Sequence, residues 1–106
     1  MGAPSKTVSL IGFATKARRI TFGTELTVGT VRKGKKGGVY LMLYASDASA
    51  NTKKRVNDCG AYHHVPVMEL SETTLELARI TGKIHPVAVI GVIDEGFANA
   101  IAKSLE

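Results

Sequence analysis

The sequence has only one cysteine, Cys59, no tryptophan, and six tyrosines and phenylalanines together among its 106 residues. A single thiol cannot form an internal disulfide or a site with several thiolate ligands, so we expect a reducing, cytoplasmic setting. No apolar run approaches the ~20 residues that span a bilayer, and no basic-then-apolar leader is present, so neither a membrane protein nor a secreted one is expected. The few aromatic residues do not suggest a base-stacking platform for single strands.

Positive charge is concentrated in the first half of the chain. Residues 1–55 carry eleven lysines and arginines against two acidic residues, a net charge of +9, whereas residues 56–106 carry three against seven, a net charge of −4. Such an asymmetry is typical of a surface that binds a polyanion. A basic surface that serves only solubility would give the same numbers, so charge alone does not choose between the two.

The hydrophobic pattern alternates between strands and helices, which indicates a single α/β domain. The apolar run 39–45 is typical of a strand buried on both faces, as in a central parallel sheet, and the run 87–93 is a second buried strand. Residues 67–70 form a shorter strand after Pro66. Helical spacing of apolar residues predicts helices from Val8 to about Ala17, over 50–61, from Ser71 to Gly82, and after Asp94.

Local sequence also predicts where these helices begin and end. Ser71 is the predicted N-cap of its helix, because Leu70 and Leu75 have the spacing of a hydrophobic staple. Gly82 is the glycine expected after the last turn of that helix, and Asp94 is the predicted cap of the final one. Residues 46–49 supply capping oxygens for the helix over 50–61, whose cations 53–55 are expected to point outward.

The segment 20–36 is ambiguous on local rules. It contains many β-branched residues together with Gly23 and Gly29, and this composition favours a β-hairpin. A helix is the alternative, with Thr24 as its N-cap and its end at Gly34.

No motif predicts catalysis or a bound cofactor. Residues 29–36 fall one residue short of a phosphate-binding P-loop, because Lys36 stands where the magnesium-holding Ser or Thr is needed, and a basic turn is expected instead. Cys59, His63 and His64 are too few for a supported zinc site, and we expect a buried thiol beside two solvated histidines. We therefore predict no catalytic residue, no metal, no nucleotide cofactor and no enzyme activity. A small enzyme that uses Cys59 is the minority alternative, and it requires a reactive thiol in the folded protein.

Four segments, in this order and spacing, resemble a known family: 22–27 (FGTELT), 45–52 (ASDASANT), 64–67 (HVPV) and 94–99 (DEGFAN). The chain is similar over about residues 8–105 to the kink-turn-binding ribosomal proteins of the L7Ae and L30e type, and especially to their small bacterial YlxQ-like branch. The resemblance implies a three-layer α/β/α sandwich around a small four-stranded mixed sheet. It implies one RNA-binding domain over residues 8–106 after an N-terminal tail of residues 1–7, and a helix rather than a hairpin over 24–34.

The resemblance also implies how RNA is bound. The N-terminus of the 24–34 helix would meet a sharply bent RNA, where free amides and the positive end of the helix dipole favour phosphates. Gly23 matches the glycine that allows close backbone approach, and Thr24 and Glu25 occupy the recognition positions. Ile84, His85 and Pro86 match a loop that packs on an extruded base. Gly29 is a departure, because the family commonly has an RNA-contacting lysine there.

The function predicted from the residues and the resemblance is non-catalytic binding of structured, kink-turn-like RNA. The expected partner is ribosomal RNA or the ribosome, with no membrane involved. The alternative is a protein-interaction module on the same fold, with weak and non-specific RNA binding, which Gly29 favours. Electrostatic affinity would come from six cations: Arg18, Arg19, Arg32, Lys33, Lys35 and Lys36.

Overall fold

A computed structural model describes residues 5–33 and 38–106 of the chain. Five helices and four strands follow one another in these ranges: α1 (Lys6–Lys16), β1 (Ile20–Phe22), α2 (Thr24–Arg32), β2 (Leu41–Tyr44), α3 (Ala50–His63), β3 (Val67–Glu69), α4 (Thr74–Thr81), β4 (Val89–Val92) and α5 (Glu95–Ser104). None of these helices has the length of apolar chain that a bilayer crossing requires.

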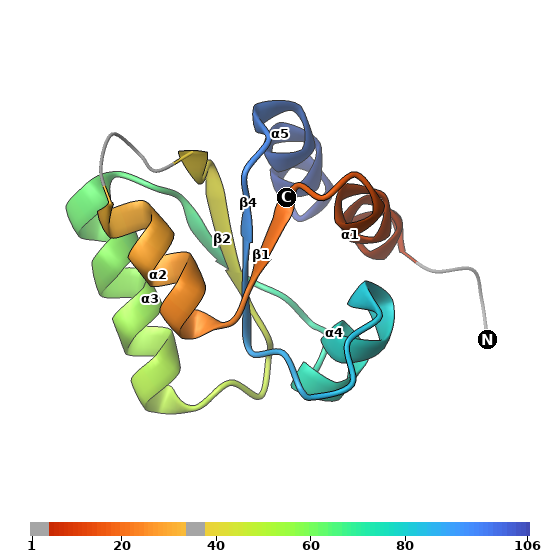
Figure 1. The fold of residues 1–106 in the computed structure, drawn as a ribbon, viewed down its shortest axis with the longest axis horizontal. Helices are drawn as coiled ribbons and strands as arrows, with labels where there is room; N and C mark the ends of the chain where they lie inside the picture. Colours follow the sequence, from red (N-terminus) through yellow and green to blue (C-terminus); the bar gives the residue numbers. More distant parts are fainter. Residues whose placement is uncertain (1–4, 34–37) are drawn as a thin grey trace.

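The four strands form one mixed sheet in the order β1-β4-β2-β3. β4 runs antiparallel to both β1 and β2, and only β2 and β3 are parallel. The expectation of a parallel setting for the 39–45 strand therefore holds on one side of β2 only. Figure 1 shows α2 and α3 on one face of the sheet and α1, α4 and α5 on the other, which confirms the predicted three-layer sandwich.

Alternation along the central strands builds a separate apolar core on each face. Leu41 and Leu43 of β2 pack with α1, α4 and α5, whereas Met42 and Tyr44 pack with α2 and α3. All four residues are buried, as the uninterrupted apolar run predicts for a strand covered on both faces. The regular strand is shorter than 39–45, and β4 is likewise shorter than 87–93.

Residues 24–32 form a helix, so the hairpin favoured by composition is wrong. The β-branched Thr27, Val28 and Val31 are buried on the side of α2 that faces the sheet. Gly91 of β4 makes this close packing possible: a Cβ there would lie 2.5 Å from the Thr21 hydroxyl oxygen and 2.8 Å from the Thr27 methyl carbon. Tertiary packing therefore overrides the weak helix propensity of the segment.

The boundaries of three helices differ from the predictions. The first helix begins at Lys6 rather than Val8, because the Ser5 hydroxyl accepts the Val8 N–H at 3.1 Å. The N-cap of α2 is Gly23 rather than Thr24, and the helix ends at Arg32 with Lys33 as its C-cap, while the predicted end at Gly34 lies outside the described residues. The helix predicted over 50–61 continues to His63.

The predicted Ser71 cap of α4 is also wrong. Thr73 is the N-cap, and it forms a reciprocal capping box in which its N–H donates to Glu76 Oε1 at 2.8 Å. The predicted staple is absent from this helix start, since Leu75 is 64% exposed. The predicted end at Gly82 is confirmed by its left-handed backbone, with φ of 74°, and Asp94 caps α5 as predicted.

Candidate functional site

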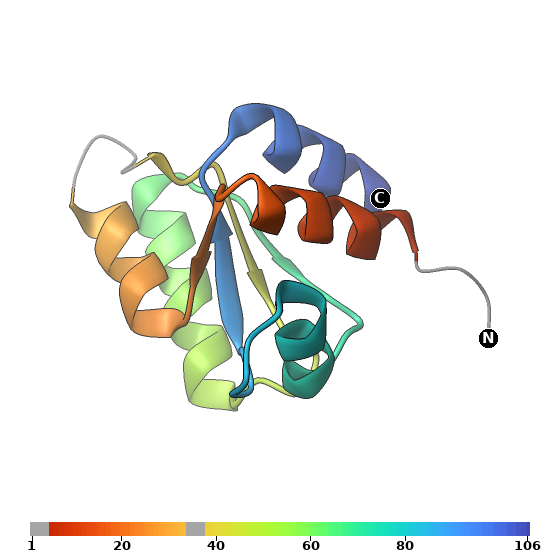
Figure 2. The same ribbon diagram turned by 45° about the vertical axis from the view of Figure 1, so that its right-hand side comes forward.

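Two predicted recognition segments that lie sixty residues apart in sequence meet at one end of the sheet. The Gly23 N–H donates to the Val89 carbonyl oxygen at 2.8 Å, which holds the start of α2 beside the start of β4. The loop before β4 therefore reaches the same place, as both views show (Figures 1 and 2). One cavity is lined by residues of both segments: Phe22, Gly23, Thr24, Lys83, Ile84, His85, Pro86, Val87 and Ala88.

The start of α2 presents backbone donors without a side-chain cap. Gly23, with φ of 91° and ψ of 153°, is the N-cap, and no side chain of the described residues bonds the first turn. By contrast, α1, α3, α4 and α5 are each capped by a hydroxyl or carboxylate. The left-handed φ strains any residue that carries a Cβ, which explains the glycine. The N-terminus of α2 therefore presents free backbone N–H groups to hydrogen-bond acceptors from outside the chain.

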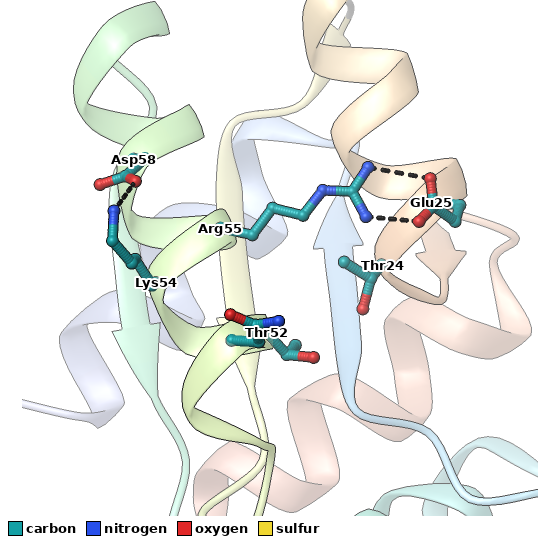
Figure 3. A pocket seen from close by; sticks show the side chains of 7 residues that line it. Thr24, Glu25, Thr52, Lys54, Arg55 and Asp58 are labelled. Carbon is teal, nitrogen blue, oxygen red and sulfur yellow. Dashed lines mark hydrogen bonds and ion pairs between the residues drawn. The ribbon is translucent and has the colours of Figure 1, made fainter.

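Glu25 forms a bidentate ion pair with Arg55 of α3. Arg55 Nη2 donates to Glu25 Oε1 at 2.9 Å, and Nη1 donates to Oε2 (Figure 3). The hydrogen bonds from Arg55, and then its charge, lower the pKa of the Glu25 carboxyl below its ordinary value. This pair crosses an open groove that is also lined by Thr24, Asn51, Thr52, Lys54 and Asp58. Arg55 is not among the predicted site residues, because helical spacing shows that its side chain points outward but not which side chain it contacts.

The loop before β4 carries the most exposed large apolar side chain of the described residues, Ile84, which is 93% exposed. His85 and Pro86 are exposed beside it. Lys83 was not predicted as a site residue, yet its ammonium nitrogen lies 4.2 Å from the centre of the Phe22 ring in the same cavity. This end of the molecule therefore combines an apolar tip, a cation and free amides.

The four predicted basic residues that the structure describes, Arg18, Arg19, Arg32 and Lys33, do not line this cavity. Arg18 and Arg19 precede β1, and the Ile93 N–H donates to the Arg19 carbonyl oxygen at 2.9 Å, so they lie at the opposite end of β4 from Gly23. Arg32 and Lys33 lie at the far end of α2. All four side chains are exposed, and none pairs with an acidic side chain in the described ranges. Lys35 and Lys36 lie outside the described residues.

Position 29 carries no side chain on the exposed side of α2. A Cβ built there would meet nothing within 4 Å. Gly29 follows Glu25 by one helical turn, so a long side chain at this position would extend beside the recognition residues. The cation nearest to Glu25 comes from α3 instead, in the form of Arg55.

Cys59 is a buried thiol in the core between α3 and the sheet, as predicted. Burial raises its pKa, while the charges of Arg32 and Arg55 act weakly in the opposite direction. His64 ends α3 in a left-handed conformation with φ of 60°. In residues 5–33 and 38–106 no three His, Cys, Asp or Glu side chains gather as metal ligands.

Comparison with known proteins identifies the family. Residues 5–102 match the Ribosomal protein L7Ae/L30e/S12e/Gadd45 family. The chain belongs to this family. It is 38% identical to "RNA-binding protein YlxQ" of Enterococcus faecium, over 99% of this chain and 96% of that protein. The protein of the same name from Bacillus subtilis is 36% identical, over 92% of each chain.

More distant relatives and solved structures agree with this membership. "Large ribosomal subunit protein eL30" of Methanosarcina mazei is 28% identical over 84% of this chain and 80% of its own length. A Bacillus halodurans protein described as of unknown function superposes with a TM-score of 0.87 at 35% identity, covering 96% of this chain and 98% of that one. The Giardia lamblia 15.5kD RNA binding protein shares the fold, with a TM-score of 0.76 at 17% identity, covering 97% and 88%. Relatives carry the names of RNA-binding and ribosomal proteins, so the family is not one of enzymes and the prediction of a non-catalytic protein holds.

Proposed function

We propose that the chain is a non-catalytic RNA-binding protein that recognises kink-turn-like RNA and associates with ribosomal RNA or the ribosome in the cytoplasm. The names of the YlxQ and eL30 relatives support RNA as the partner. The observation that carries the proposal is the single cavity shared by the start of α2 and the 83–88 loop. The predicted amide-donating and apolar recognition elements, distant in sequence, are thereby available to one ligand.

The chemistry of this cavity fits a kinked RNA better than a regular duplex. The deep, narrow major groove of A-form RNA does not admit protein side chains, whereas a kink opens the groove and unstacks bases. The free amides and positive dipole of the α2 start favour the crowded phosphates of a bend. Ile84, with almost its whole side chain exposed, would cover an unstacked base. Gly23, Thr24, Glu25, His85 and Pro86 would complete the contact surface.

The exposed cations at the other end of the sheet would bind the RNA backbone. Arg18, Arg19, Arg32 and Lys33 lie about 13 Å from the cavity, the length of β4 or of α2. An RNA helix that leaves the kink is long enough to cover this distance. Phosphate contacts of this kind add affinity without sequence selectivity.

The test compares a hairpin RNA that contains a kink-turn with an uninterrupted hairpin of the same length. We expect tighter binding of the kinked RNA and a linear fall of log affinity with log salt, with a slope of about −0.7 to −0.9 per phosphate neutralised. Ile84→Ser should weaken kinked-RNA binding by about tenfold, through loss of apolar contact with a base. Leu75→Ser on α4 is the matched control, because it removes another exposed apolar side chain that does not line the cavity.

A protein-interaction module is the second candidate function. Leu26 of α2 supports this candidate, because its apolar side chain is 58% exposed beside the recognition positions. The missing side chain at Gly29 supports it as well. Equal binding of the kinked and uninterrupted hairpins, with Ile84→Ser indistinguishable from wild type, would favour this candidate over kink-turn recognition.

A further inference from the structure

Arg55 reaches the recognition end of α2 from a different helix. Its guanidinium spans the groove between α3 and α2 and meets both carboxylate oxygens of Glu25, as Figure 3 shows. The acidic side chain at a predicted recognition position is therefore occupied in the free protein. The Arg55 guanidinium is paired as well, so neither charged group is available to a ligand while the ion pair is formed.

The exposure of the pair indicates that it does not serve mainly to hold the fold together. The side chains of Arg55 and Glu25 are 43% and 82% exposed, and exposed ion pairs contribute little to stability. The cores that join α2, α3 and the sheet are apolar and include Val28, Val31 and Val56. The consequence of the pair lies instead in which ligands can reach its two charged groups.

Both members of the pair have a planar, two-pronged geometry that other groups can match. A guanidinium binds a phosphate in the same bidentate manner as a carboxylate. A carboxylate can accept two parallel N–H bonds, and the N1–H and N2–H groups of an unpaired guanine edge present such a pair of donors. An RNA that offers both a phosphate and a guanine edge can replace both partners at once.

We propose that Arg55 is a further RNA-binding residue and that RNA binding exchanges the partners of the Glu25–Arg55 pair. In the complex, Arg55 donates to a phosphate and Glu25 accepts from a guanine edge. This inference rests on the proposed RNA-binding function. The exchange conserves charge-assisted hydrogen bonds, because each group loses one bidentate partner and gains another. A regular duplex offers a phosphate but no free guanine edge, so Glu25 would lose Arg55 without gaining a new partner. The ion pair therefore discriminates against a regular duplex.

A purely positioning role for Arg55 makes a different prediction. If Arg55 only orients Glu25, loss of either charge weakens the binding of kinked RNA to the same extent. The binding of a regular duplex is then unaffected. If the partners exchange, the two substitutions act in opposite directions on the duplex. Glu25→Gln releases Arg55 to bind any phosphate, whereas Arg55→Gln leaves an unpaired carboxylate facing the RNA.

The experiment measures equilibrium binding of the full chain to the kink-turn hairpin and to the uninterrupted hairpin over a salt series. For Glu25→Gln we expect about three- to tenfold tighter binding of the uninterrupted hairpin, with a salt slope steeper by about 0.7 to 0.9. For Arg55→Gln we expect about tenfold weaker binding of both RNAs, with a salt slope that is shallower by the same amount for the kinked RNA, because only there does wild-type Arg55 bind a phosphate. Inosine, which lacks the N2 amine, is substituted for each guanine of the kinked RNA in turn. At one position this substitution should weaken binding by the wild-type chain and leave the affinity of Glu25→Gln unchanged.

Controls separate charge, folding and pairing. Lys103→Gln on α5 removes one exposed positive charge from the opposite face of the sheet, so its affinities should stay within about twofold of wild type. Thermal unfolding of every variant checks that the fold is retained. The hydrogen bonds and the charge of Arg55 lower the pKa of the Glu25 carboxyl below its ordinary value, so mild acidification should not reproduce the effect of Glu25→Gln.

Two results would overturn the inference in distinguishable ways. Equal weakening of kinked RNA by Glu25→Gln and Arg55→Gln, with no change for the uninterrupted hairpin, would show a positioning role while RNA recognition stands. Absence of measurable binding of either RNA by the wild-type chain would instead remove the proposed function on which the exchange depends.

Discussion

The hydroxyl oxygens of Thr21 and Thr27 lie 2.8 Å apart and share a hydrogen bond that joins β1 to α2. The bond lies over Gly91, the β4 residue whose lack of a side chain lets α2 approach the sheet. Thr27 is completely buried. This contact fixes the helix whose first residues line the candidate site, so it links the packing of the sheet to the placing of Thr24 and Glu25.

Thr27→Val should destabilise the protein while preserving its shape. The substitution leaves the Thr21 hydroxyl facing a methyl group, and loss of a buried hydrogen-bond partner costs about 1 to 2 kcal/mol. The free energy of unfolding is measured by urea titration, with an unchanged m value expected. Thr30→Val is the control, because the Thr30 hydroxyl bonds only the Leu26 carbonyl oxygen of its own helix near solvent. Equal losses in the two variants would contradict the role given to Thr27.

Glycine-to-alanine substitution should have opposite effects in two neighbouring helices. At Gly29 of α2 a Cβ meets nothing within 4 Å, so alanine should stabilise the protein by up to about 1 kcal/mol through helix propensity. At Gly60 of α3 a Cβ would lie 2.6 Å from the Val65 carbonyl oxygen and would overlap the Val67 side chain. Overpacking there should cost about 1 to 3 kcal/mol. Urea titration of both variants measures the difference, and a shared sign would show that the packing around one of them is misassigned.

The order of helices and strands could be predicted from sequence because alternation and helical spacing are local patterns. The strand over 20–22 had no such pattern, since three residues are too few to show one. Local rules did not predict α2, because the residues that disfavour a helix, such as Thr27 and Val31, are the ones that pack against the sheet. Only the resemblance predicted this helix before the structure did.

The residues of the candidate site could likewise be predicted only in part. Gly23 and Ile84 were predicted from the family pattern, and the structure brings their segments together through the β1–β4 pairing. The Glu25–Arg55 pair joins residues thirty positions apart on two helices, and no local spacing encodes such a contact. The basic residues were treated as one group because charge was counted along the chain, whereas the fold places Arg18, Arg19, Arg32 and Lys33 at the end of the sheet opposite the cavity.

Gly29→Lys should strengthen binding of kinked RNA. The new side chain would lie one helical turn after Glu25, in open space, where it can reach a phosphate or compete with Arg55 for the Glu25 carboxylate. Either contact adds a cation near the recognition end, and we expect a gain on the order of tenfold with a salt slope steeper by about 0.7 to 0.9. Gly29→Gln restores helix propensity and length without charge and is the control. Identical affinities for the lysine and glutamine variants would mean that this face of α2 does not approach RNA.

Cys59 should react slowly with alkylating agents while the protein is folded. The thiol is buried against Val56 and the sheet, and burial raises its pKa above the ordinary value, so the thiolate fraction at pH 8 falls below that of an exposed cysteine. Access and ionisation therefore act in the same direction, and iodoacetamide should modify the folded chain at least about tenfold more slowly than the urea-unfolded chain. Intact-mass spectrometry over time gives both rates on the same sample. A folded rate equal to or above the unfolded rate would require an activated thiolate, and it would revive the nucleophilic role that the sequence left as a minority alternative.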